Sequence, residues 1–113
     1  MKTKYVATAV VLLALGAPAQ ETPAKALADY RRQIDAIDQR IVAALNERAK
    51  VAEQIGRLKR KLEMPVAAPK REREVLENVA RNNSGPLPSE ALQRIYQRII
   101  AEMTAFEQAG MRK

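Results

Sequence analysis

Two cations lie at positions of a predicted helix where apolar side chains are expected. Apolar residues recur with helical spacing from Leu27 to Leu62, and at about 100° per residue Arg48 and Lys59 fall within roughly 20° of each other in the apolar stripe. The stripe around Arg48 consists of Ile34, Ile37, Ile41, Leu45, Val51, Ala52 and Ile55. A buried cation needs a counter-charge. That anion is either a carboxylate of another helix or a bound ligand, and both interpretations remain open here.

Four more charged residues are predicted to face helix-lined space. Glu72 lies on the apolar face of a second predicted helix, directly after Arg71, and Glu107 lies near the edge of the apolar face of a third. Arg31 is rotated about 100° from Arg48 on the first helix. It cannot easily share a pocket with Arg48 of its own chain, but it could reach the pocket of a partner. Together with Arg48 and Lys59, these residues make an arrangement of four cations and two carboxylates that could bind an anion.

The elements that position these residues are all helical. The first predicted helix covers 27–63 and is stopped by Met64-Pro65-Val66. The second covers 69–81, with Pro69 suited to its first turn, and the third covers 88–108 after the breaker 82–86. There is no strand-like alternation and no Gly-rich phosphate loop. The fold class is therefore predicted as all-α, with one long and two short helices.

The length of the first helix favours a homodimer. Its residues would span about 55 Å, whereas a compact monomer of this size has a radius of gyration near 12 Å. Two short helices cannot cover such a rod, so we expect two chains to pack their long helices together in an entwined dimer. A solitary coiled-coil segment is the alternative, but Arg48 and Lys59 interrupt its seam.

Residues 1–19 are typical of a signal peptide, with a basic start, an apolar run and small residues before a cut near Ala19/Gln20. The run is short for a membrane span, although an uncleaved anchor is the alternative. Cleavage predicts a periplasmic or secreted protein without stable membrane association. The mature chain then comprises a flexible lead-in (20–26), a helical domain (27–108) and a C-terminal tail (109–113).

Composition limits the chemistry. The 113 residues include no His and no Cys, so a Cys/His metal site is impossible and the commonest general base is missing. Losing the leader with Lys2 and Lys4 leaves 18 basic and 13 acidic residues, a net charge of +5, which would steer anions toward the protein. Three Tyr and one Phe offer little base stacking, so nucleic acid is not expected as a partner. We expect no metal and no cofactor.

The order and spacing of these residues resemble a known family, the all-helical class of chorismate mutases. The resemblance covers 27–108 and is ungapped through the first two helices. It is carried by Arg31-x-x-Ile34-Asp35-x-Ile37-Asp38, Arg48, Lys59, Pro65-Val66, Arg71-Glu72-x-x-Val75-Leu76 and Ile95-Tyr96-Gln97-x-Ile99-Ile100. It implies an entwined dimer with two equivalent sites, each borrowing one Arg from the other subunit, and a step of the shikimate pathway of aromatic amino acid biosynthesis.

By this resemblance the protein is an isomerase that converts the dicarboxylate chorismate to prephenate in a Claisen-type rearrangement. Such a reaction is accelerated by fixing a compact substrate conformation and aiming charges at the ether oxygen. Arg48 and the partner's Arg31 would clamp the carboxylates, and Lys59 would contact the ether oxygen. The implied catalytic residues are Arg48, Lys59 and Glu107. The implied substrate-binding residues are Arg31, Arg48, Lys59, Arg71, Glu72, Met103 and Glu107.

Two positions depart from the common pattern of the family, and a third varies among its members. Ala68 replaces an Asp cap before the second helix, which should start less firmly. Met103 replaces a Ser and removes one polar contact. Glu107 stands where Gln is frequent beside the ether oxygen, as in some relatives. It should work protonated, with its pKa raised by partial burial unless the charge of Lys59 lowers it.

Two alternatives remain open on the sequence. An isochorismate pyruvate lyase shares the fold and pocket, but Arg71-Glu72 favours the mutase because Glu72 offers an acceptor for the ring hydroxyl of chorismate. A non-enzymatic periplasmic helical dimer that binds anions would explain the basic charge. It would not explain why Arg48 and Lys59 occupy core positions.

Overall fold

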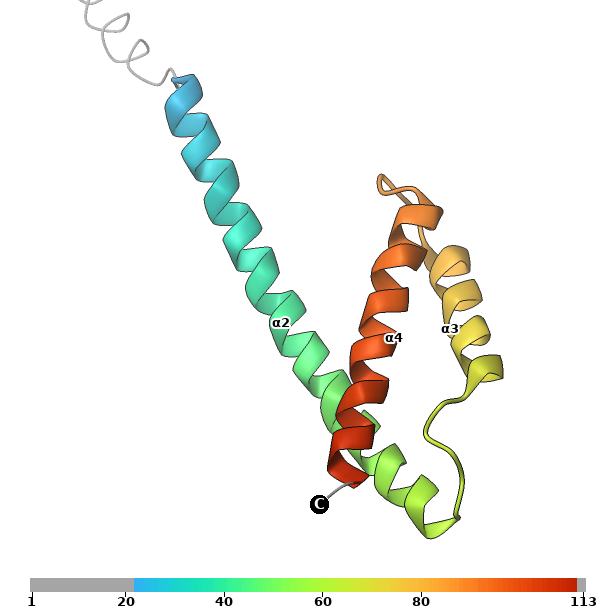
Figure 1. The fold of residues 1–113 in the computed structure, drawn as a ribbon. Coiled ribbons are helices and arrows are strands. Elements are labelled where there is room, and N and C mark those ends of the chain that lie inside the picture. Colours follow the sequence, from blue (N-terminus) through green and yellow to red (C-terminus); the bar gives the residue numbers. More distant parts are fainter. Residues whose placement is uncertain (1–21, 112–113) are drawn as a thin grey trace, which may run out of the picture. The chain divides into compact units, whose positions relative to one another are not determined.

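Three helices make up the residues that the structure, a computed structural model, describes, namely 22–111. They are α2 (Pro23–Lys61), α3 (Pro69–Asn82) and α4 (Ser89–Met111), shown in Figure 1. The predicted all-α class, with one long and two shorter helices, is confirmed for this range. The predicted leader and its cut near Ala19/Gln20 lie outside the described residues. None of the described helices combines the length and hydrophobicity needed to cross a membrane.

The chain divides into two units, residues 1–41 and residues 42–113, and α2 runs through both. Helix α2 begins at Pro23, so the prediction of a flexible lead-in over 20–26 is wrong for residues 23–26. The side-chain oxygen of Thr22 accepts a hydrogen bond of 3.1 Å from the backbone N–H of Lys25, which caps the helix. Pro23 then occupies the first helical position, where its missing N–H costs nothing.

The end of α2 is fixed by its backbone as well as by the following proline. The N–H of Met64 donates to the carbonyl of Lys59 at 2.8 Å, and the N–H of Glu63 donates to the carbonyl of Arg60 at 3.2 Å. This pattern is the Schellman motif, which needs a left-handed residue after the helix. Glu63 takes that conformation, with φ of 56°. The chain therefore reverses sharply into the loop that precedes α3.

Helix α3 begins without a side-chain cap. Ala68 makes no capping hydrogen bond, as predicted, and Pro69 occupies the first turn. At the other end, the Asn83 side chain organises the turn into α4: its amide donates to the carbonyl of Leu87 at 2.8 Å and to the hydroxyl of Ser89 at 3.0 Å. Helices α3 and α4 pack side by side (Figure 1) and are joined by a 3.1 Å bond from the Gln93 amide to the carbonyl of Leu76.

Helix α4 continues to Met111, so the predicted tail over 109–113 is wrong for residues 109–111. Gly110 lowers the helical propensity of this stretch but does not end the helix. Within residues 42–111, α4 meets α2 at Gly56, where a side chain would lie against Glu107. Among the described residues only Ala52 and Gly56 are buried, so this part of the chain encloses very little core by itself.

Candidate active site

A cavity of about 410 Å³ lies within residues 42–111, between the C-terminal half of α2, the start of α3 and the C-terminal half of α4. It brings together six of the seven residues predicted to bind a substrate, namely Arg48, Lys59, Arg71, Glu72, Met103 and Glu107. The rest of its wall is mainly apolar and consists of Val51, Ala52, Ile55, Val66, Ala68, Val75, Ile100 and Thr104. Helical spacing therefore predicted most of the polar wall of the cavity.

Arg31 is the exception. It lies in the other unit of the chain, on the N-terminal part of α2, and its side chain is exposed. It is not among the described residues that line this cavity. Its predicted contribution across a dimer stays a prediction.

The two cations of the apolar stripe both face the cavity. Arg48 and Lys59 are half-buried, and in the part of the chain that the structure describes neither forms an ion pair with a carboxylate. The Lys59 ammonium instead donates a hydrogen bond of 2.7 Å to the main-chain carbonyl of Val66. A neutral carbonyl positions the cation without neutralising it. Both positive charges therefore remain available to an anion in the cavity.

The first turn of α3 supplies a third cation and one carboxylate. Arg71 is exposed at the rim, where its guanidinium lies 3.5 Å from the carboxylate of Glu74 one turn later. Glu72 is half-buried in the cavity wall. Pro69 opens α3, and of the charged side chains in this turn Arg71 and Glu72 line the cavity.

Glu107 reaches the cavity from α4. One of its carboxyl oxygens, Oε2, is buried and has no hydrogen-bond partner within residues 22–111. Burial raises the pKa of Glu107 above its ordinary value, and the positive charges of Lys59 and Arg48 oppose that rise. The predicted direction of the pKa shift is confirmed. When Glu107 is protonated, three cations face one carboxylate, which suits a doubly negative ligand.

Sequence reasoning missed two polar groups of the wall. The Val66 carbonyl is a main-chain group and leaves no signal in the residue pattern. The other is Thr104, which lies one turn before Glu107 on the same face of α4 and is half-buried. Its hydroxyl makes no hydrogen bond among the described residues. The spacing of Thr104 to Ile100 and Glu107 could have revealed it.

Comparison with known proteins agrees with this geometry. The family model described as chorismate mutase type II matches residues 30–108, which is most of the chain. The chain belongs to this family. Over 85 residues it is 44% identical to the bifunctional chorismate mutase/prephenate dehydratase of Aquifex aeolicus, with 72% of this chain and 24% of that protein covered. The chain thus spans about a quarter of the length of the curated relatives it matches.

Solved structures of the family share the fold. Form II of the chorismate mutase from Thermus thermophilus superimposes with a TM-score of 0.71 at 30% identity, covering 73% of this chain and 93% of that one. The chorismate mutase of Helicobacter pylori in complex with prephenate gives a TM-score of 0.72 at 28% identity, covering 77% and 94%. The match therefore extends over nearly the whole of these small relatives.

The described residues contain no group of three or more acidic side chains arranged to hold a metal ion. The chemical resources of the site are cations, two carboxyl groups and one hydroxyl, set in an apolar wall. Such a set can bind and orient an anionic substrate and stabilise negative charge that develops on it.

Proposed function

We propose that this protein is a chorismate mutase, an isomerase that rearranges chorismate to prephenate. The observation that carries the proposal is the pair of half-buried cations, Arg48 and Lys59, which face a cavity without any ion-pair partner in residues 22–111. Membership of the chorismate mutase type II family supports the same substrate. A half-buried cation that no carboxylate of the chain meets calls for an anionic ligand.

The reaction suits the groups present. In chorismate the ether C–O bond breaks while a C–C bond forms in the same molecule, so no group leaves and no electron donor or acceptor is required. Arg48 binds a substrate carboxylate through its planar guanidinium. Lys59 and protonated Glu107 stabilise the negative charge that grows on the ether oxygen. Glu72 accepts a hydrogen bond from the ring hydroxyl, and Arg71 supports the same wall.

The active form that we propose is an entwined homodimer in which Arg31 of each chain completes the site of the other. The apolar face of residues 27–41 supports a partner, because Ile34, Ile37 and Ile41 are 56%, 40% and 50% exposed. Exposed apolar patches of this kind mark interaction surfaces. An isologous contact would bury the same face on both chains.

We further propose that the protein is exported and acts in the periplasm or outside the cell after loss of residues 1–19. The proposal depends on the basic start and the apolar run of that segment. Mass spectrometry of the mature protein should find an N-terminus near Gln20. An intact Met1 on protein recovered from the periplasm or medium would contradict cleavage.

Loss of chorismate absorbance, with prephenate as product, tests the activity directly. Arg48→Ala should lower kcat/KM by two orders of magnitude or more, because each hydrogen bond to a charged group contributes about 1.5–3 kcal/mol. The matched control is Arg98→Ala, because Arg98 is an exposed residue of α4 paired with Glu102. Pyruvate release from isochorismate in place of prephenate formation would identify a lyase. Ligand binding without turnover of either compound would identify a binding protein.

A further inference from the structure

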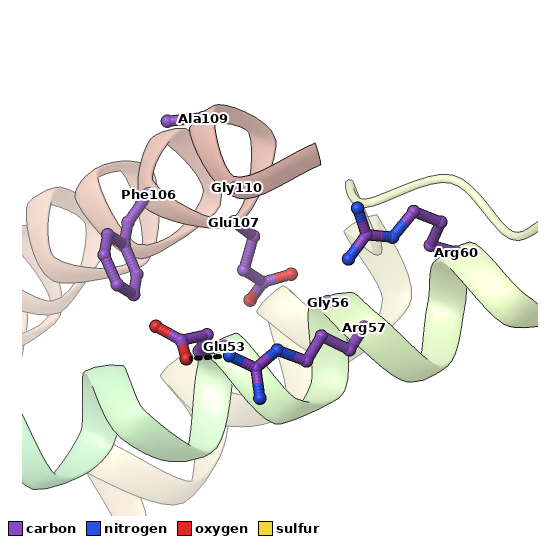
Figure 2. A pocket seen from close by; sticks show the side chains of 8 residues that line it. All are labelled: Glu53, Gly56, Arg57, Arg60, Phe106, Glu107, Ala109 and Gly110. Atoms are coloured by element: carbon purple, nitrogen blue, oxygen red, sulfur yellow. Dashed lines mark hydrogen bonds and ion pairs between the residues drawn. The ribbon is translucent and has the colours of Figure 1, made fainter. Parts of the chain in front are cut away.

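Glu107 lies between two hollows. On one side it lines the cation-bearing cavity with Arg48 and Lys59. On the other it lines a second hollow of about 400 Å³. That hollow is also lined by Glu53, Gly56, Arg57, Arg60, Phe106, Ala109 and Gly110 (Figure 2). The side chain could therefore extend toward either hollow, and the backbone of α4 alone does not decide between them.

Gly56 is the residue of α2 that lies against the stem of Glu107. A Cβ atom built on Gly56 would lie 3.5 Å from both Cβ and Cγ of Glu107 and 3.9 Å from its Cα. Figure 2 shows the Glu107 side chain directed from α4 toward α2 beside Gly56. Gly56 is one of the two buried residues of the described chain. The two methylene groups of Glu107 thus rest on bare helix backbone.

A side chain larger than a methyl group at position 56 would occupy the space of these methylene groups. A methyl group would only make ordinary van der Waals contact, but atoms beyond Cβ would have to displace Glu107 or separate α2 from α4. Displacement toward the second hollow would bring the carboxyl group into water and away from the cations of the first. The missing side chain of Gly56 therefore leaves room for the stem of Glu107 against α2, with the carboxyl oxygen Oε2 buried.

We infer that Gly56 is a positioning residue, which sets the depth at which Glu107 enters the substrate cavity. The inference rests on the proposed mutase function and extends it to a residue that touches no substrate. It predicts an effect on kcat rather than on KM, because the substrate carboxylates are bound by other residues.

The test is a double-mutant cycle between positions 56 and 107. Gly56→Val should lower kcat at least about tenfold and change KM by less than about threefold. In the Glu107→Ala background the same change should lower kcat less than about twofold, because the group that Gly56 positions is gone. Gly110→Val is the matched control for a β-branched residue in a helix, since nothing lies within 4 Å of a Cβ at Gly110. Gly56→Ala should lose less than Gly56→Val.

The pH profile supplies a readout that general loss of structure would not move. A carboxyl group displaced toward water has a lower pKa, so the alkaline fall of kcat in Gly56→Val should begin at lower pH than in the wild type. The charged groups that face Glu107 from the packed elements are Arg48, Lys59, Glu53, Arg57 and Arg60 of α2 and Arg71 and Glu72 of α3. All of these stay unchanged in the Gly56 variants.

Equal losses of kcat in the two backgrounds, or wild-type kcat in Gly56→Val, would overturn the inference and leave the mutase function intact. A wild-type protein without turnover would overturn both. Circular dichroism checks that each variant is folded. If Gly56→Val does not fold, Gly56→Ser, which has one atom beyond Cβ, replaces it in both backgrounds. The inference then requires that Gly56→Ser lower kcat more in the wild-type background than in the Glu107→Ala background.

Discussion

The Lys59 ammonium donates a hydrogen bond of 2.7 Å to the main-chain carbonyl of Val66, and both residues line the cation-bearing cavity. This bond joins the last turns of α2 to the loop before α3. An ammonium group has three donors, so two remain for other acceptors. The half-buried cation is thus held in place by a neutral partner while its charge stays uncompensated. A lysine held in this way is preorganised to meet an anionic oxygen.

Replacing Lys59 by Met should therefore abolish most of the activity. Met keeps much of the length and apolar character of the stem but supplies neither the charge nor the donors. Loss of one preorganised donor to a developing oxyanion reduces rates about 10²–10³-fold, and we expect kcat to fall by at least this much. Lys50→Met, at an exposed position of the same helix, is the control. A Lys59→Met protein with more than a tenth of wild-type kcat would contradict this role.

Glu107→Gln should flatten the pH profile. Because burial raises the pKa of Glu107, the wild type keeps a protonated donor beside the ether oxygen at low pH and loses it as pH rises through that pKa. An ionised carboxylate would repel the negative charge developing on the oxygen, so wild-type kcat should fall as pH rises through the raised pKa of Glu107. Gln cannot ionise. Glu102→Gln, on an exposed face of α4, should keep the wild-type profile, and a pH-independent wild type would refute the proposed protonation.

The ionisation of Glu107 should also affect the stability of the folded protein, which should decrease as pH rises. The folded-state pKa of Glu107 is raised, so the unfolded chain releases this proton at lower pH than the folded protein. The free energy of unfolding of the wild type should fall as pH rises from the ordinary value of 4.5 through the raised pKa, relative to Glu107→Gln. Urea midpoints of the two proteins across this range measure it. A constant difference between the midpoints would show that Glu107 ionises alike in both states.

The features that the sequence predicted correctly are those set by periodicity within one helix. Arg48 and Lys59 are eleven positions apart, close to three full turns, and they line one cavity. Pro69 marks the start of α3 because its ring suits the first turn. The predicted start of α2, at residue 27, is too late. The proline at position 23 favours a loop unless Thr22 is recognised as the N-terminal cap of the helix.

The structural features that the residue pattern did not predict depend on how the helices cross or on main-chain atoms. The contact of Gly56 with Glu107 exists only because α4 lies against α2 at that turn. The carbonyl of Val66 can meet Lys59 only because Glu63 adopts a left-handed conformation and turns the chain. The ion pair between Arg71 and Glu74 likewise depends on the rotamer of an exposed side chain, which the residue pattern does not specify.

Thr104 should contribute to substrate binding, whereas its neighbour Met103 lacks the hydroxyl that a Ser at that position would offer. Its hydroxyl is free among the described residues and belongs to the cavity wall. One hydrogen bond from a hydroxyl to a substrate carboxylate stabilises the complex by about 1.5 kcal/mol. Thr104→Val, which keeps the shape, should therefore raise KM roughly tenfold with little change in kcat. Thr104→Ser should restore KM, and an unchanged KM in Thr104→Val would exclude the contact.

Mixing two inactive variants tests whether Arg31 acts across a dimer. If each site uses its own Arg48 and the partner's Arg31, a mixed dimer of Arg31→Ala and Arg48→Ala chains has one site with both arginines and one with neither. Random reassociation makes half of the dimers mixed, so about a quarter of the wild-type activity should return. The control mixes Arg31→Ala chains with chains that carry both Arg31→Ala and Arg48→Ala. This mixture should stay inactive, because every site then lacks Arg31. If Arg31 served its own chain's site, co-refolding the two variants would restore nothing, even though size measurements showed mixed dimers.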